Sequence, residues 1–480
     1  MSQQQGPQPG ESGAPGRTAV RGGLLVTASD ELHADLLIED GRIAAVAARH
    51  TGLADAWQAD RTLDATGMYV LPGGVDAHTH MEMPFGGTFA SDTFETGTRA
   101  AAWGGTTTIV DFALQTKGRS LREGLDAWHA KADGQCAIDY GFHMVLSDVT
   151  PESLKETDFL VEEGVTSFKL FMAYPGVFYS DDGQILRAMQ QTAHTGGLPM
   201  VHAENGIAID VLVEQALAAG RTDPRVHGEV RKELLEAEAT HRAIQLARVA
   251  GSPLYVVHVS AEKALEQLVA ARDENLPVFG ETCPQYLFLD VDNLAEPDFG
   301  GSKYVCSTPL RPREHQEALF RGLRTDDLQV VSTDHCPFCF AGQKELGRDD
   351  FSKIPNGMPG VENRMDLLHQ AVVEGRLTRR RWVEIACAAP ARMFGLYPKK
   401  GTLAPGSDAD LVLYDPDAEQ VLSAQTHHMN VDYSAYEGKR VTGGVVTVLS
   451  RGATVLDRGT YTGRAGHGQY VPRGTCQLLA

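Results

Sequence analysis

Eight short apolar runs, rich in β-branched residues, recur along the middle of this 480-residue chain, and amphipathic segments with helical spacing separate most of them. Strands that are apolar along their whole length indicate a parallel sheet buried on both faces. Eight repeats of strand and helix fit a closed (β/α)8 barrel of the α/β class. The alternative is a doubly wound open sheet, in which functional residues would gather at the one point where the strand order reverses. The runs lie at 68–76, 106–113, 137–147, 166–174, 199–204, 254–260, 278–283 and 329–334.

The amphipathic segments predict the helices that would cover such a sheet. Ser120, Ser180 and Ser260 stand at the start of three of them. A serine hydroxyl there can accept a hydrogen bond from an unpaired N–H of the first turn, so we expect these residues to be N-caps. The predicted helices lie at 120–133, 151–163, 183–195, 229–250, 261–273 and 313–324.

Both ends of the chain carry strand and turn signals instead. Between residues 34 and 46, two strand-like stretches flank Asp40-Gly41, a dipeptide typical of two-residue hairpin turns. Residues 401–457 have a similar pattern. We therefore expect residues 19–72 and 400–457 to form one small β-sandwich domain, with the barrel between them at 73–399.

The outermost segments read as tails. Residues 1–18 are rich in Gln, Gly, Pro and Ser and have almost nothing to bury, which predicts a disordered tail. For residues 458–480 two interpretations stand, a contact with a neighbouring subunit and a loose tail.

Composition disfavours several classes of partner. The formal net charge of −20 argues against nucleic acid and anionic membranes, because like charges repel. No apolar run approaches the roughly 20 residues that span a bilayer. Seven scattered cysteines and the absence of an apolar leader segment predict a cytoplasmic protein. The pair Cys336 and Cys339 lacks a second pair at zinc-site spacing, so two free thiols in a loop are expected.

Metal-capable side chains stand at the ends of four predicted strands. His78 and His80 are two residues apart, so their imidazoles project from the same face. His202, His258 and Asp334 end three other runs, and imidazole and carboxylate suit a borderline divalent ion. Each histidine alone would more commonly be structural. Because strand ends meet at one mouth of a barrel, the set together predicts a two-metal hydrolase.

Lys169 lies inside another of the predicted strands, the run at 166–174. An ammonium in an apolar strand is costly unless it is paired, and one interpretation is a buried salt bridge. In the other, two nearby metal cations lower the lysine pKa and favour the neutral amine. A neutral amine can take up carbon dioxide to form a carbamate, whose two oxygens could bridge the metals.

Longer motifs surround these residues. They read DAHTHMEMPFGGTFASDTF at 76–94, FKLFMAY at 168–174, VHAEN at 201–205, ETCPQY at 281–286, STDHCPF at 332–338 and NGMPGVE at 356–362. In combination they resemble the dihydropyrimidinase and D-hydantoinase family of cyclic amidohydrolases, from about residue 20 to 460. The resemblance implies a TIM barrel with a β-sandwich side domain, a site with two zinc ions, and a homotetramer.

The resemblance also implies roles for single residues. Tyr174 would polarise the substrate carbonyl, and backbone groups of Ser307 and Asn356 would hold the ring amide. Met83, Phe171 and Phe178 would contact the exocyclic substituent of the ring. One metal would be held by His78, His80 and Asp334, the other by His202 and His258, and carboxylated Lys169 would bridge both.

The expected reaction is hydrolysis of the ring amide of 5,6-dihydropyrimidines or 5-substituted hydantoins to N-carbamoyl amino acids. Asp334 would accept a proton from water and return it to the leaving nitrogen. Met81 and Phe85 are expected to extend this apolar lining, which suits substituted hydantoins. Thr308 stands where relatives often have proline, and residues 220–233 match the family poorly, so no function is assigned there.

Other functions remain as alternatives at this point. Allantoinase is one. Dihydroorotase-like enzymes usually carry an arginine just after H-x-H, where this chain has Met81-Glu82-Met83. A non-catalytic scaffold related to dihydropyrimidinase would lack most of the metal-associated residues, all six of which are present. A single-metal deaminase on the same barrel usually lacks the lysine.

Overall fold

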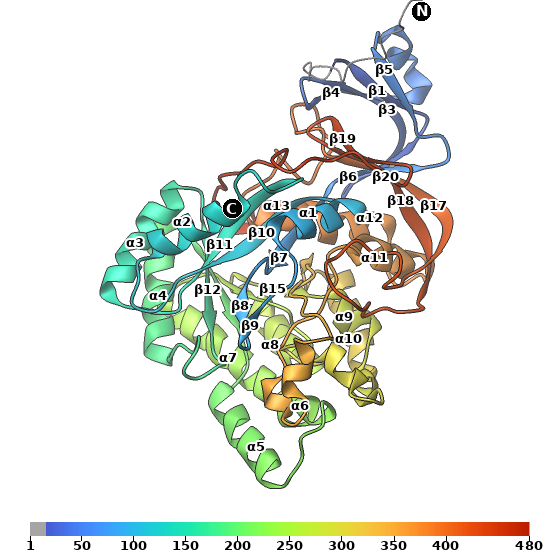
Figure 1. The fold of residues 1–480 in the computed structure, drawn as a ribbon. Helices are drawn as coiled ribbons and strands as arrows, with labels where there is room; N and C mark the ends of the chain where they lie inside the picture. Colours follow the sequence, from blue (N-terminus) through green and yellow to red (C-terminus); the bar gives the residue numbers. More distant parts are fainter. Residues whose placement is uncertain (1–15, 480) are drawn as a thin grey trace, which may run out of the picture.

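A computed structural model of the protein, which describes residues 16–479, contains the expected barrel (Figure 1). Its eight strands are all parallel and pair in sequence order. A bridge between Thr79 and His335, with a 2.9 Å hydrogen bond from the His80 N–H to the His335 carbonyl, joins the last strand to the first. The closed barrel is therefore confirmed. Its strands are β7 (Gly74–Thr79), β10 (Thr106–Leu114), β11 (Asp139–Val145), β12 (Ser167–Phe171), β13 (Leu198–His202), β14 (Leu254–Val256), β15 (Val278–Thr282) and β16 (Val330–Val331).

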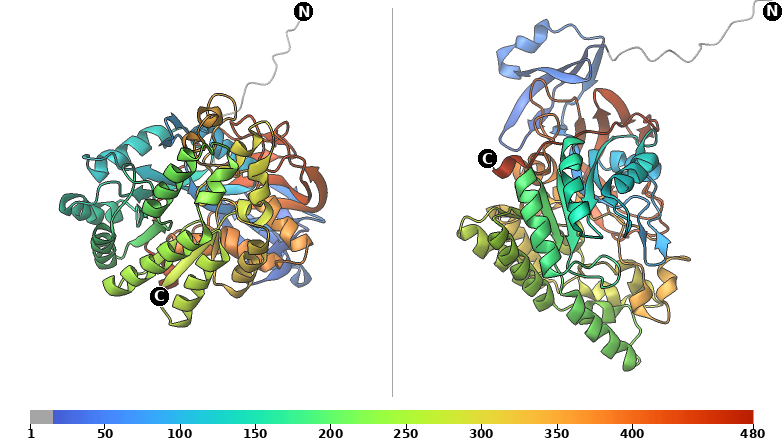
Figure 2. Two further views of the ribbon diagram at one scale, coloured as in Figure 1. Left: turned by 90° about the horizontal axis from the view of Figure 1, so that it is seen from below. Right: turned by 90° about the vertical axis from the view of Figure 1, so that its left-hand side faces the viewer.

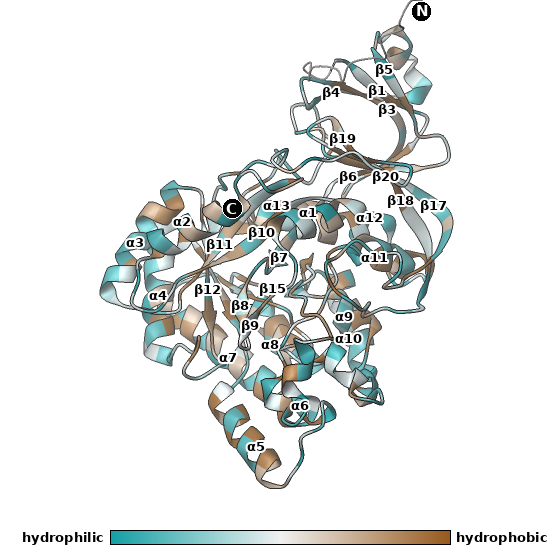
Figure 3. Ribbon diagram, in the orientation of Figure 1, coloured by the Kyte–Doolittle hydropathy of each residue, from teal (hydrophilic) through white to brown (hydrophobic). Residues whose placement is uncertain are grey.

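Helices surround the barrel, as Figure 2 shows from below. In Figure 3 the barrel strands are mainly hydrophobic while these helices carry hydrophilic residues, which fits a sheet buried on both faces. All six predicted helices occur as α2 (Leu121–Ala132), α3 (Pro151–Glu162), α4 (Asp182–Thr195), α7 (Glu233–Ala250), α8 (Glu262–Asp273) and α10 (Glu314–Thr325). The others are α1 (Phe94–Trp103), α5 (Gly206–Ala218), α6 (Arg225–Val230), α9 (Pro284–Phe288), α11 (Arg364–Val373), α12 (Arg379–Val383) and α13 (Ala389–Met393).

Two of the three predicted helix caps were wrong. Ser120 does cap α2, accepting a 3.1 Å hydrogen bond from the Glu123 N–H. The cap of α4 is Asp181, the residue after Ser180. The Ser260 hydroxyl donates to the buried Glu236 carboxylate at 2.6 Å. It is used in this tertiary contact and does not cap α8.

The first apolar run, 68–76, is not one strand. It divides at Gly73 into β6 (Tyr69–Pro72), which joins a different sheet, and β7 of the barrel. A Cβ atom at Gly73 would lie 2.1 Å from the Thr107 hydroxyl. The chain can therefore leave one sheet and enter the other only where a side chain is missing.

The second sheet is built from both ends of the chain and stands beyond one end of the barrel (Figures 1 and 2). The hairpin at Asp40-Gly41 is confirmed: both residues have positive φ, 50° and 75°, as a type I′ turn requires. The sheet curls over its own apolar core. Its ten strands are β1 (Thr18–Arg21), β2 (Leu24–Val26), β3 (Glu31–Glu39), β4 (Arg42–Ala48), β5 (Arg61–Asp64), β6, β17 (Leu411–Val421), β18 (Arg440–Ser450), β19 (Ala453–Asp457) and β20 (Thr460–Tyr461).

A buried ion cluster joins the two sheets. The Lys400 ammonium contacts Asp139 of β11 at 2.6 Å, and Asp408 and Asp410 just before β17 at 2.9 and 2.7 Å. Arg451 forms a further ion pair with Asp139. Three buried carboxylates lie within ligand distance of one another, but the lysine occupies the space between them. The cluster is therefore an ion-pair network that holds the second sheet to the barrel.

The C-terminal residues lie on the chain's own barrel. Tyr470 forms a bridge to Tyr140, and the Arg473 guanidinium donates to the Ser167 hydroxyl at 2.9 Å, at the amino-terminal end of β12. The described part of residues 458–480 is therefore held to this subunit. Most of the expected N-terminal tail, residues 1–15, lies outside the described residues, and Thr18 already belongs to β1.

Two further expectations concern the cysteines and the membrane. All seven cysteines lie in the part of the chain that the structure describes, and all are free thiols. Within residues 16–479, none of the helices combines the length and the apolar character needed to cross a bilayer.

Candidate active site

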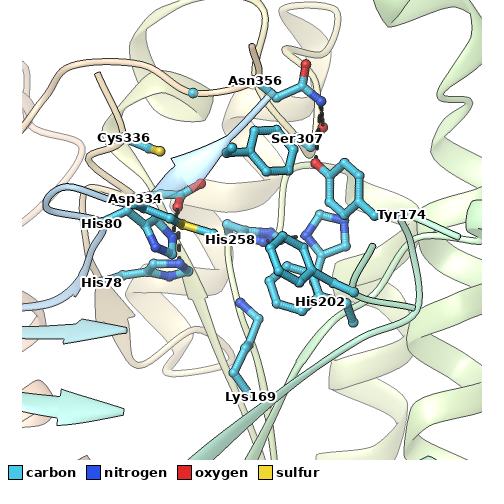
Figure 4. Close-up of a pocket in the computed structure, with 15 residues that line it drawn as sticks. His78, His80, Lys169, Tyr174, His202, His258, Ser307, Asp334, Cys336 and Asn356 are labelled. Atoms are coloured by element: carbon cyan, nitrogen blue, oxygen red, sulfur yellow. Dashed lines mark hydrogen bonds and ion pairs between the residues drawn. The ribbon is translucent and has the colours of Figure 1, made fainter. Parts of the chain in front are cut away.

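A cavity at the carboxyl ends of the barrel strands collects the side chains that the sequence placed at strand ends (Figure 4). All six predicted metal-associated residues line it, as do Tyr174, Ser307 and Asn356. The strands run parallel, so their ends open at one mouth. The complete lining is His78, His80, Met83, Phe85, Lys169, Phe171, Tyr174, Phe178, His202, His258, Ser307, Asp334, Cys336, Asn356 and Gly357.

One group of nitrogen and oxygen atoms converges on the side of β7. The Nε2 atoms of His78 and His80 lie 3.1 and 3.2 Å from the same atom, Oδ1 of Asp334. His78 Nε2 is fully buried, and its contact with Asp334 does not have the geometry of a hydrogen bond, so among the described residues it has no hydrogen-bond partner. A buried polar atom without a partner is costly, and a metal ion between these three side chains would satisfy it.

A second group converges on the opposite side. The Nδ1 atom of His202 lies 2.9 Å from the Nε2 atom of His258, and both rings are buried. Burial lowers the pKa of both imidazoles, so both are neutral at pH 7. Two neutral imidazole nitrogens pointing at one place can share a divalent ion.

Lys169 points into the space between the two groups (Figure 4). It is 1% exposed, and its Nζ lies 5.0 Å from the ring centres of both Phe112 and Phe171. Within residues 16–479 no carboxylate oxygen lies within 4.0 Å of Nζ, so the salt-bridge interpretation was wrong. Burial lowers the pKa of Lys169 to about 8, which makes the neutral amine readily accessible.

The acidic and basic groups of the β7 side have widely separated pKa values. Burial lowers the pKa of His80 to about 4. Burial also acts to lower the pKa of His78, but the Glu281 and Asp334 carboxylates outweigh it and raise the value to about 9. Burial opposes ionisation of Asp334, yet the two imidazoles hold its pKa well below 3.8. Asp334 is therefore an anion, as a ligand or proton acceptor must be.

Glu281 orients His78. Its carboxylate forms a very short contact with His78 Nδ1, which leaves Nε2 to face the cavity. The Tyr255 hydroxyl donates to the other Glu281 oxygen at 2.9 Å. A carboxylate behind a ligating histidine fixes its tautomer and raises its basicity. The sequence prediction missed this role, although Glu281 begins one of the quoted motifs.

Glu204 and Arg231 support His202 in a similar way. Glu204 lies 2.8 Å from His202 Nε2, which turns Nδ1 toward the cavity. The Arg231 guanidinium donates to the same carboxylate at 2.6 Å. Burial acts to raise the pKa of Glu204, but Arg231 and His202 lower it to about 2. Residues 220–233 therefore do reach the site, and only the fold could show it, because no local pattern links residue 231 to residue 204.

Three residues of the cavity have left-handed backbone conformations. Tyr174, His258 and Asp334 have φ values of 63°, 41° and 51°. Residues with a Cβ rarely adopt positive φ, and such strain persists only where the surrounding structure enforces it. The strain here lies at the turns by which the chain leaves the barrel strands.

Polar groups form the outer rim. The Asn356 side-chain amide donates to the Ser307 hydroxyl at 3.0 Å and to the Tyr174 hydroxyl at 3.4 Å. Burial raises the pKa of Tyr174, so its hydroxyl stays protonated at neutral pH and can donate. Among residues 16–479, no backbone hydrogen bond occupies the main-chain groups of Ser307 or Asn356.

Aromatic rings form the apolar wall. Phe171 stacks on Phe178 with 5.1 Å between ring centres, and Phe85 meets Tyr174 edge to face at 5.3 Å. Met83 and Phe85 come from the loop and the short hairpin β8 (Pro84–Phe85) and β9 (Thr88–Phe89). Met81 was wrongly placed in this wall: it packs against Gly97 of α1 in the core. Cys336, which was not assigned to the site, lines the cavity.

The chain is similar in sequence and in fold to known cyclic-amide hydrolases. The sequence model of the amidohydrolase family matches residues 69–455. The chain is 79% identical to the D-hydantoinase of Streptomyces coelicolor over 463 residues, 96% of this chain and 99% of that protein. It is 52% identical to the D-hydantoinase of Geobacillus stearothermophilus, covering 95% and 96% of the two chains. The solved dihydropyrimidinase of Brevibacillus agri superposes with a TM-score of 0.94 at 49% identity, covering 96% and 99%.

The contact behind His78 gives a test of the site. Glu281→Gln keeps the shape of the side chain but removes the charge that fixes the His78 tautomer, so we expect a 10- to 100-fold weaker affinity for divalent metal. Metal retained after dialysis against graded chelator measures it. Glu214→Gln on the exposed part of α5 is the matched control. Equal metal retention in both variants would contradict the role of Glu281.

Proposed function

The chain belongs to the amidohydrolase family and is an enzyme that hydrolyses cyclic amides, and we propose that its substrates are D-enantiomers of 5-substituted hydantoins. The product is the ring-opened N-carbamoyl amino acid. One observation carries the proposal: two groups of metal-binding atoms flank a buried lysine, beside a wall of aromatic rings. The relatives at 79% and 52% identity are both named D-hydantoinase, which supports the choice of ring and enantiomer.

The residues present fit a pair of metal ions, and zinc suits their donor set of imidazole and carboxylate. Bound there, two such ions activate a water molecule as a nucleophile and offset negative charge on the substrate carbonyl. Lys169 would carry a carbamate, formed if its neutral amine attacks carbon dioxide and loses a proton. The carbamate would replace a buried amine with an anion that could help to hold both ions. The six ligands are His78, His80, Asp334, His202, His258 and carboxylated Lys169.

Asp334 moves the proton. As an anion at the mouth of the barrel, it accepts a proton from the attacking water and delivers it to the ring nitrogen as the carbon–nitrogen bond breaks. Tyr174 keeps its own proton and donates a hydrogen bond to the carbonyl oxygen. Donors of this kind, aimed at developing charge, typically contribute a factor of about 10² to 10³ in turnover.

The ring is held on its other side by main chain. The free backbone groups of Ser307 and Asn356 pair with the N–H and C=O groups of the substrate amide. Backbone groups suit this task because neighbouring peptide bonds fix their direction. They also bind the part that all substrates share, which leaves selection among substrates to other residues.

Selection is the task of Met83, Phe171 and Phe178. Together they present an apolar surface to the substituent at ring carbon 5. An aryl or alkyl group gains from burial there by about 25 cal/mol per Å² of apolar area. Dihydrouracil has no such group and is the second candidate, favoured by the likeness to a dihydropyrimidinase structure.

A comparison of three substrates tests the assignment. We expect kcat/KM for D-5-phenylhydantoin to exceed that for the L-enantiomer and for dihydrouracil by about tenfold or more, because an apolar pocket discriminates by factors of this order. Initial rates are measured by release of the N-carbamoyl product, with chelator-treated protein as the control. A preference for dihydrouracil would support the second candidate, and an L preference would overturn the enantiomer.

Removal of Lys169 tests the bridge. In Lys169→Ala the anion between the two metal groups is lost, so we expect both bound metal and turnover to fall by at least tenfold. Elemental analysis of the purified variant gives the metal per chain. Lys155→Ala, on the exposed part of α3, is the control. Full metal content with normal turnover in Lys169→Ala would contradict a bridging role.

We propose a homotetramer and a cytoplasmic location as well. Ile207 and Val211 on α5 expose 53% and 48% of their surface, and apolar area of this kind favours contact with another subunit. Seven free thiols are typical of a reducing compartment.

We expect sedimentation velocity to show a species of four chains. A monomer over the whole concentration range would contradict this assembly, with Ile207→Lys as the variant expected to weaken it.

A further inference from the structure

We propose that Lys344 is a positioning residue for substrate binding, whose buried side-chain nitrogen fixes the two backbone segments that carry Ser307 and Asn356. The inference rests on the proposed roles of those two residues in holding the ring amide. Lys344 itself touches neither the cavity nor any of the six proposed metal ligands by a hydrogen bond or an ion pair within residues 16–479.

Lys344 is a fully buried lysine, and among the described residues it has no anionic partner. It begins the short helix η5 (Lys344–Gly347) and is 0% exposed. Its Nζ donates to three main-chain carbonyls, those of Val305 at 3.0 Å, Pro355 at 2.7 Å and Gly357 at 2.7 Å. In the described chain no carboxylate oxygen lies within 4.0 Å of Nζ. An ammonium has three N–H donors, so the three carbonyls use all of them.

These carbonyls belong to the segments that face the substrate. Pro355 and Gly357 flank Asn356, and Val305 precedes Ser307 by two residues. The Gly357 N–H donates to the Val305 carbonyl at 3.0 Å, and the Asn356 amide donates to the Ser307 hydroxyl at 3.0 Å. The two segments are therefore tied to each other directly, and Lys344 ties both from the side away from the cavity.

Buried acceptors without other donors converge on Nζ. Three carbonyl dipoles point at one place inside the protein, where water cannot replace a lost donor. The Val305 carbonyl also accepts from the Gly357 N–H, but within residues 16–479 the carbonyls of Pro355 and Gly357 have no donor besides Nζ. A side chain without N–H groups would leave both unpaired, and the loop could satisfy them only by moving. Movement of Pro355 or Gly357 displaces the Asn356 main chain between them.

The same turn also reaches the β8–β9 hairpin, which contributes to the wall of the pocket. The preceding residue, Gln343, donates from Nε2 to the Thr88 hydroxyl and to the Phe89 carbonyl, both at 2.8 Å. Those residues form β9, the partner strand of β8, whose Phe85 lines the cavity. Residues 343 and 344 thus connect this hairpin with the segments that carry Ser307 and Asn356.

The test is Lys344→Met, which fills the space but donates no hydrogen bond. Because binding of the ring amide is used in both the ground state and the transition state, we expect KM for D-5-phenylhydantoin to rise about tenfold or more, with kcat within threefold of the native value. Metal per chain should stay unchanged. If Lys344→Met does not fold, Lys344→Gln, whose shorter side chain cannot reach all the carbonyls from the same position, should still raise KM above the native value while metal per chain stays unchanged, and a native KM in folded Lys344→Gln would then overturn the positioning role.

Lys400→Met is the matched control, since it removes the other buried, multiply bonded lysine far from the cavity. It should lower the thermal midpoint without changing KM. An unchanged KM in folded Lys344→Met, or a loss of metal in proportion to activity, would overturn the positioning role. Absence of turnover in the native enzyme would instead contradict the proposed function, so the two failures can be told apart.

Discussion

Parallel backbone pairing runs through all eight barrel strands, from β7 to β16, and the remaining features of the site depend on it. Parallel hydrogen bonding gives every strand the same direction, so residues that are more than 250 positions apart, such as His78 and Asp334, end at one mouth. The bridge between Thr79 and His335 then closes the ring next to both of them. Without closure, the imidazoles of β7 and the carboxylate after β16 would lie on opposite edges of a sheet.

Burial sets the chemistry at that mouth. The same low-dielectric surroundings that lower the pKa of Lys169 and His80 would also make a lone carboxylate costly. Asp334 remains an anion because two imidazoles face it, and Glu204 because Arg231 pairs with it. The protein thus places imidazole nitrogens beside a fixed negative charge, which is a donor set that suits a divalent cation and that an apolar core alone would not hold.

The substrate side of the cavity is built differently, from turns and not from strand ends. Ser307 and Asn356 lie on segments without regular structure, which a barrel does not fix by its own hydrogen bonds. Their positions are fixed from behind instead, by the buried Lys344 ammonium and by side-chain contacts such as Asn356 to Ser307. Metal binding and substrate binding therefore have separate supports, although both open into one cavity.

The barrel, the five metal-capable residues at or after its strand ends, Lys169 within another strand and the hairpin at Asp40-Gly41 could all be predicted from the sequence alone, because they follow from the spacing of apolar residues, strand order and turn chemistry. The sequence could not determine how far apart those side chains lie, nor which groups stand behind them. Arg231, Glu281 and Lys344 show why: each acts on a residue distant in sequence, and each is tolerated in the interior only because folding brings hydrogen-bond partners to it. Likewise, only tertiary packing decided that Ser260 bonds Glu236 and does not cap α8, that Met81 lies in the core and that the first apolar run divides at Gly73. Each of these depends on a contact with a residue from another element.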